Sequence, residues 1–120
     1  MLLIHASLYV LAHKWGVDGL QRLTLFKLYK TLELLPLSHA NVQHIVHLAR
    51  YIYSDENTPD LVRGIDEMRE LVCHYIAINA EIMLEDASFV LFIEEGGAFV
   101  RDLWKVAAPR LRLPKSTAFH

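Results

Sequence analysis

The spacing of the apolar residues is the feature that most constrains the fold of this chain. Along most of the 120 residues they recur at intervals of three and four, with almost no strict alternation. That spacing places them on one side of an α-helix. The five glycines and four prolines fall between these segments. The sequence therefore predicts an all-α fold of about six helices in an orthogonal and antiparallel array, with no sheet.

Capping residues and helix breakers give the expected helix boundaries. Gly16 ends the first helix, Asp18 caps the second, and Pro36 ends the second. Thr58 followed by Pro59 predicts the start of the longest helix, because proline at the first helical position loses no hydrogen bond. The expected helices are residues 6–14, 19–34, 38–53, 60–84, a short segment after Asp86 closed by Gly96-Gly97, and 98–107.

The chain carries more apolar residues than its core needs. Hydrophobic residues make up 53% of the sequence, and the mean hydropathy is +0.24. A chain of this length buries roughly two-thirds of its unfolded surface, so part of the apolar excess is expected to face a partner. The second helix is apolar on two sides, which is typical of a helix sandwiched between neighbours.

The charge balance argues against a polyanionic partner. Twelve basic and fourteen acidic residues give a net charge of −2 and a pI of about 6.4. A short basic run near the C-terminus is the one candidate for binding nucleic acid or acidic lipid, weighed against a solvated, flexible tail over residues 109–120. We favour the tail and expect no nucleic-acid partner. The run consists of Lys105, Arg110, Arg112 and Lys115.

The number of cysteines and the first residues of the chain indicate the expected cellular compartment. The single cysteine, Cys73, excludes an intramolecular disulfide and suits a reducing compartment, so we expect a cytoplasmic or nuclear protein. The apolar start, residues 2–4, is interrupted by His5 and is too short for a signal peptide or a membrane span. We expect no membrane partner.

Two groups of polar residues could in principle hold a metal ion. His44 and His47 lie together on one helix surface, and Glu67, Glu70 and His74 are stacked on another. This leaves a small metal- or ligand-binding helical protein as the alternative function. Helical metal centres project their ligands into the interior, however, and these residues belong to polar faces. We therefore expect no metal and no cofactor.

No arrangement of residues indicates catalysis. Cys73 lies at the margin of an apolar face, and His74 points about 100° away from it around the helix, so Cys73 is interpreted as a packed small hydrophobe. Gly96-Gly97 lacks the spacing and the lysine of a phosphate-binding loop. Asn79, on the apolar side of the longest helix, is expected to bond a neighbouring backbone group, with a role in an interface as the alternative. The sequence predicts a protein that is not an enzyme.

Large apolar side chains are the candidates for partner contacts. Tryptophan is a frequent anchor of protein interfaces, so an exposed Trp104 would mark a binding surface. The apolar N-terminal helix supplies further candidates. The residues expected to contact a protein partner are Leu3, Leu8, Leu11, Trp15, Phe99 and Trp104.

Two stretches resemble a known family. Ala12-His13-Lys14-Trp15, followed by Leu20, resembles the alanine–x–lysine–aromatic stretch and later leucine in the closing helices of a BTB/POZ domain. Residues 71–80, 84–89 and 94–99 are similar to the helical extension that follows BTB domains in many fungal proteins, laid out like the three-box and BACK helices of speckle-type POZ proteins. The resemblance covers about residues 3–107. It implies closing BTB helices over residues 1–35 and a BACK-like extension over 36–108.

The resemblance implies an adaptor or scaffold. In that family this region extends the surface that grips the cullin scaffold of a ubiquitin ligase, and in some members it mediates self-association. The strands and helices that form the first part of a BTB domain do not precede Leu3. The chain is therefore expected to be the C-terminal part of such a protein. We expect a protein partner, a homo-oligomer and, as one further partner, a cullin scaffold.

Overall fold

The computed structural model describes residues 2–54 and 57–111. Within them the chain forms seven α-helices and one short 3₁₀ helix, and no strand, which confirms the all-α prediction. The helices are α1 (Leu2–Lys14), α2 (Asp18–Leu34), α3 (Val42–Ile52), α4 (Glu67–Ile78), α5 (Ala80–Leu84), α6 (Ala87–Glu94) and α7 (Ala98–Ala107), followed by η1 (Ala108–Leu111).

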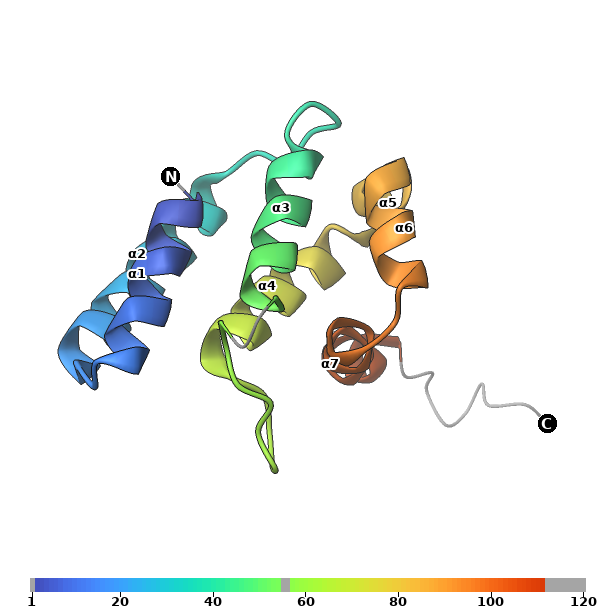
Figure 1. The fold of residues 1–120 in the computed structure, drawn as a ribbon. Helices are drawn as coiled ribbons and strands as arrows, with labels where there is room; N and C mark the ends of the chain where they lie inside the picture. The colour runs from blue at the N-terminus through green and yellow to red at the C-terminus, as the bar shows by residue number, and fades with distance from the viewer. Residues whose placement is uncertain (1, 55–56, 112–120) are drawn as a thin grey trace.

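The helices are arranged around α3 and α4 (Figure 1). The antiparallel hairpin of α1 and α2, which we call the N-terminal hairpin, packs on one side of them. On the other side, α6 contacts α3 and α5 lies beside α6. Helix α7 packs against α4 at the end where the loop after α3 also lies. The N-terminal hairpin and the α5–α6 pair therefore form opposite ends of the molecule.

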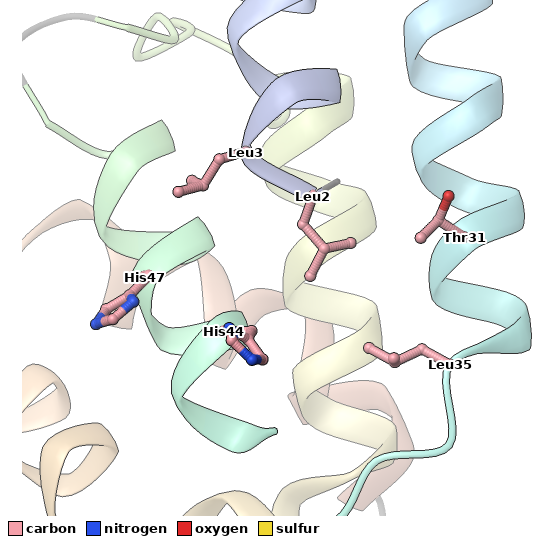
Figure 2. A pocket seen from close by; sticks show the side chains of 6 residues that line it. All are labelled: Leu2, Leu3, Thr31, Leu35, His44 and His47. Atoms are coloured by element: carbon pink, nitrogen blue, oxygen red, sulfur yellow. The ribbon is translucent and has the colours of Figure 1, made fainter. Parts of the chain in front are cut away.

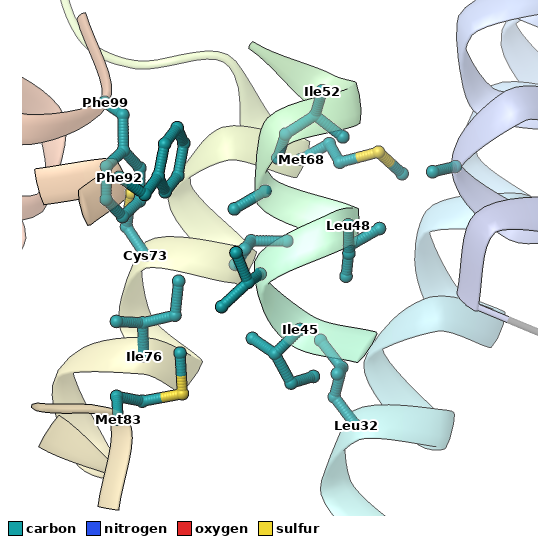
Figure 3. Packing of buried hydrophobic residues seen from close by; sticks show 14 of the residues in the cluster. Leu32, Ile45, Leu48, Ile52, Met68, Cys73, Ile76, Met83, Phe92 and Phe99 are labelled. Atoms are coloured by element: carbon teal, nitrogen blue, oxygen red, sulfur yellow. The ribbon is translucent and has the colours of Figure 1, made fainter. Parts of the chain in front are cut away.

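One continuous core joins all these helices. Figure 3 shows Ile45, Leu48 and Ile52 of α3 between side chains from both ends of the molecule. On one side they face Leu32 of α2, and on the other they meet residues from α4 to α7. Phe99 of α7 lies in an aromatic cluster, stacked on Phe92 with ring centroids 4.3 Å apart. Helix α3 is the element through which the two ends share a core.

The ends of α6 and α7 agree with the sequence prediction. The side chain of Asp86 accepts a hydrogen bond from the backbone N–H of Phe89, as a helix N-cap does. Gly97 precedes α7 with φ 81° and ψ −159°, a conformation that is open essentially to glycine alone. These two signals are local, so they do not depend on the tertiary fold.

Other boundaries differ from the prediction. Helix α1 begins at Leu2 rather than at residue 6, and Asp18 lies in the first turn of α2 while Val17 is the N-cap. Helix α3 begins only at Val42 because the side chain of Asn41 accepts a hydrogen bond from the Ser38 N–H and donates one to the Pro36 carbonyl, which holds a turn before the helix.

The long fourth helix was predicted wrongly at its start and in its continuity. Asp66, not Thr58, caps α4, accepting hydrogen bonds from the N–H groups of Met68 and Arg69. The helix also breaks at Asn79, so that α5 follows as a separate turn. The Asn79 amide does bond a backbone group, as predicted, since it donates to the Tyr75 carbonyl at 2.8 Å.

The C-terminal segment is only partly within the structure. The 3₁₀ helix η1, residues 108–111, overlaps the start of the flexible tail that was expected over residues 109–120. Arg112 and Lys115 of the basic run lie outside the described residues. Among the described helices, none combines the length and apolar character needed to cross a membrane.

Candidate functional site: the outer face of the N-terminal hairpin

Helix α1 is apolar on both of its sides, and only one side is covered. Ala6, Tyr9 and Val10 are buried against the rest of the molecule. On the opposite side an exposed stripe runs the length of the helix at intervals of three and four residues. We call these residues the α1 stripe: Ile4, Leu8, Leu11 and Trp15, exposed by 58, 37, 44 and 75%.

Helix α2 adds further exposed apolar side chains to the N-terminal hairpin. The sequence predicted that neighbours would cover both sides of this helix, and the structure corrects that prediction. Only the side that carries Thr24, Leu28 and Leu32 is buried, because no element lies beyond the N-terminal hairpin in the described residues. The apolar residues left exposed on α2 are Leu20, Leu23, Phe26, Tyr29 and Leu34.

The predicted contact residues divide into three groups. Leu3, Leu8, Leu11 and Trp15 are all exposed and all lie on or beside the N-terminal hairpin. Trp104 is 65% exposed but lies on α7, away from that hairpin. Phe99 is 2% exposed, which corrects its prediction as a surface contact. Its ring fills the centre of the aromatic cluster with Tyr53, Phe89 and Phe92.

A cleft of about 430 Å³ opens where α1, α2 and α3 meet (Figure 2). Leu2 and Leu3 of α1 and Leu35 supply most of its apolar wall. His44 and His47 line it from α3, and Figure 2 shows both rings on the side of α3 that faces the cleft. The cleft offers a small apolar surface with two imidazoles beside it.

The proposed metal ligands do not form a metal site. His44 and His47 lie on α3 beside the cleft, whereas Glu67, Glu70 and His74 lie on α4. In the part of the chain that the structure describes, no three histidine, cysteine, aspartate or glutamate side chains are grouped so that they could hold a metal ion. The two sets that the sequence suggested are not brought together.

A buried polar network beneath the loop after α3 was not anticipated from the sequence. Arg69 of α4 is buried, and its Nε and Nη2 donate to the side-chain and backbone oxygens of Thr58 at 2.7 and 2.8 Å. Its Nη1 pairs with Asp60 and lies 3.7 Å from Asp102, which is 1% exposed. The guanidinium also lies over the ring of Tyr53. The network ties the loop to α4 and α7.

Burial and charge in this network shift several pKa values. The hydrogen bond from Arg69 holds the pKa of Asp60 below its ordinary value. Burial raises the pKa of the Cys73 thiol to about 11. Burial, and then the nearby carboxylate of Asp66, raise the pKa of Tyr9 to about 12. Burial also raises the pKa of Tyr53, whose hydroxyl donates to Asp102 at 2.7 Å.

These shifts favour a structural role for the network rather than a reactive one. A nucleophilic cysteine needs a lowered pKa and access to solvent. Cys73 has neither, because its pKa is raised and it is fully buried. The exposed apolar face of the N-terminal hairpin is a separate feature, and among the described residues it is the candidate surface for binding a partner.

Comparison with known proteins does not assign the chain to a family. No family model, curated protein or solved structure matches it.

Proposed function

We propose that this chain is a non-catalytic protein-interaction module that self-associates through the outer face of its N-terminal hairpin. The α1 stripe is the observation that carries the proposal. Its four side chains are 37 to 75% exposed and form an apolar patch along one face of α1, a kind of surface that often marks a protein interface. Helix α2 of the same hairpin exposes further apolar side chains, among them Leu23 and Phe26.

The composition of this face is that of a protein interface. Trp15 is the largest side chain on it and the most exposed of the α1 stripe. Tryptophan contributes large contact energies when a partner buries it. Lys14 and Lys27 lie next to the apolar residues on the surfaces of α1 and α2, as the charged rim of an interface does.

Within this proposal, the resemblance to BTB-associated helices suggests the narrower role of an adaptor or scaffold. The order of motifs in residues 5–20 and 71–99, together with the all-helical fold, supports it. On this proposal residues 1–35 correspond to closing BTB helices and 36–108 to a BACK-like extension. A cullin scaffold of a ubiquitin ligase is then a further partner. The single, buried cysteine suits a cytoplasmic or nuclear site of action.

Sedimentation velocity of the purified chain over a range of concentrations tests the self-association. We expect the average sedimentation coefficient to rise with concentration. The double substitution Leu11→Gln and Trp15→Gln should abolish that rise, because it removes apolar area from the α1 stripe without touching the core. Val62→Gln is the matched control, since Val62 is fully exposed in the loop before α4. A wild-type chain that stays monomeric throughout would overturn the proposal.

The cleft beside His44 and His47 supports a second candidate, the binding of a small apolar ligand with an acidic group. Its apolar walls could take a hydrocarbon, and the imidazoles could donate hydrogen bonds to a carboxylate. Titration with a fluorescent fatty-acid analogue tests this function. We expect saturable binding that weakens in the double substitution His44→Ala and His47→Ala and not in Gln43→Ala, at an exposed neighbouring position. Equal binding by both variants would refute it.

A further inference from the structure

The charges of the molecule are separated between its two ends, although the net charge is only −2. Helices α1 and α2 carry four basic residues against two acidic ones. No lysine or arginine occurs between Arg69 and Arg101, a span that includes all of α5 and α6. The acidic residues in and beside those two helices are Glu81, Glu85, Asp86, Glu94 and Glu95; of these, Glu95 pairs with Arg50 of α3 and Glu85 with His39. Figure 1 places α1 and α2 at one end of the molecule and α5 and α6 at the other.

The acidic end also exposes large apolar side chains. Leu84 of α5 and Leu91 of α6 are 55 and 59% exposed. Glu81 precedes Leu84 by three residues and Glu94 follows Leu91 by three, so each carboxylate lies next to a leucine on its helix surface. This combination of apolar and acidic side chains, which we call the α5–α6 patch, is the kind of surface that a partner can cover.

The N-terminal hairpin presents the same arrangement with the opposite charge. Lys14 follows Leu11 by three residues, and Lys27 follows Leu23 by four, so basic groups lie next to the exposed leucines. The ammonium group of Lys30 lies 5.5 Å from the ring centre of Phe26. The two ends thus offer apolar surfaces with complementary charged rims.

We propose that copies of this chain associate head to tail, with the N-terminal hairpin of one copy docked on the α5–α6 patch of the next. The inference rests on the proposed self-association and adds the second surface to it. A two-fold dimer of hairpins would instead bring the basic residues of both copies together. Like charges placed opposite each other at an interface disfavour that pairing, whereas opposite charges favour it.

Head-to-tail contact has a consequence for the size of the assembly. Each docked copy still has one unused N-terminal hairpin or one unused α5–α6 patch. An interface made of two different surfaces therefore continues into a ring or an open chain and does not stop at two copies. We expect the mass distribution to extend beyond a dimer as concentration rises.

Charge reversal on each end separately tests the inference. The first variant combines Lys14→Glu with Lys27→Glu, and the second combines Glu81→Lys with Glu94→Lys. All four residues are exposed, and circular dichroism checks that both variants stay folded. We expect each variant alone to associate at least about tenfold more weakly than the wild type, because like charges now meet at the interface. Arg63→Glu with Lys105→Glu, at exposed positions elsewhere, should leave association unchanged.

Mixing the two reversed variants gives the decisive result. The acidic hairpin of the first variant complements the basic patch of the second, and the remaining two surfaces also match, so the mixture should regain wild-type association. Added salt should weaken the wild-type assembly, since exposed charges are screened. Sedimentation velocity and light scattering measure both effects.

The outcomes separate this inference from the proposed self-association. If the α5–α6 reversal leaves association intact while the hairpin reversal abolishes it, the copies pair hairpin to hairpin, and only the head-to-tail inference is wrong. Failure of the mixture to regain association also overturns the inference. If the wild type is monomeric at every concentration, the proposed self-association is wrong as well.

Discussion

Replacing Arg69 with methionine isolates the contribution of the buried network to stability. The methionine side chain fills the space of the arginine stem but carries no charge and donates no hydrogen bond. The change removes the hydrogen bonds to both Thr58 oxygens and the ion pair with Asp60. It also leaves the carboxylate of Asp102 without its nearest buried cation.

The size of the effect follows from burial. Removing one partner of a buried ion pair typically costs 3–5 kcal/mol, because the other partner stays buried and charged. Asp102 keeps hydrogen bonds from Arg101 and Tyr53, so the lower end of that range applies. We expect Arg69→Met to lower the free energy of unfolding by about 3 kcal/mol, a large part of the 5–15 kcal/mol typical of a domain.

Urea unfolding followed by far-ultraviolet circular dichroism measures this loss. Arg63→Met is the matched control, because Arg63 is exposed in the same loop, and its effect should stay within about 0.5 kcal/mol. A cycle with Asp102→Asn should show a coupling of about 1–3 kcal/mol between the two residues. An Arg69→Met loss no larger than that of Arg63→Met would refute the role assigned to the network.

Three further predictions concern single residues. Gly97→Ala should lower the thermal midpoint of unfolding, because the backbone conformation of Gly97 costs other residues about 1–3 kcal/mol. Gly19 lies inside α2 with free space around it, so Gly19→Ala should raise the free energy of unfolding by about 0.4–1 kcal/mol. Asp66→Ala should lower the free energy of unfolding, measured in urea, by about 2–4 kcal/mol, since it removes the α4 cap and the acceptor of the buried Tyr9 hydroxyl. Asp66→Asn keeps an acceptor oxygen and should recover most of that loss. Burial raises the pKa of the Cys73 thiol from 9.0 to about 11. The stabilisation that the buried neutral thiol adds to the free energy of unfolding is therefore complete below pH 9 and is lost as pH rises from 9 to 11. Cys73→Ala should therefore flatten the fall of stability between pH 9 and 10, and an unchanged slope in urea unfolding would contradict this.

The parts of the fold that sequence reasoning predicted depend on short-range signals. The apolar spacing gave the helical class, and Asp86 and the Gly96-Gly97 pair gave the limits of α6 and α7. Each of these effects acts within a few residues of its cause. The start of α4 was predicted wrongly because two capping signals compete, Thr58-Pro59 and Asp66. The competition is decided by Arg69, which holds Thr58 from eleven positions away.

The candidate site was predictable in part. The exposed residues of α1 follow from a helix that is apolar all round in a chain with surplus apolar residues. The exposure of α2 and the burial of Phe99 depend on which helices lie beside them, and helical spacing does not contain that information. The separation of charge is similar. The span without lysine or arginine between Arg69 and Arg101 is visible in the sequence, but its position opposite the N-terminal hairpin depends on how α5 and α6 pack.

The anchoring of the loop after α3 has a consequence for the order of folding. Two of the contacts that fix this loop join residues far apart along the chain: Tyr53 and Asp102 are 49 positions apart, and Asp60 and Arg101 are 41 apart. During synthesis the N-terminal hairpin can form from neighbouring residues as soon as they emerge. Arg69 can hold the loop once α4 has formed, but the contacts with Arg101 and Asp102 form only after α7 has left the ribosome. We therefore expect chains truncated before Asp102 to fold at the hairpin and to leave the loop more open to proteases than in the complete chain, so this half of the molecule completes its structure last.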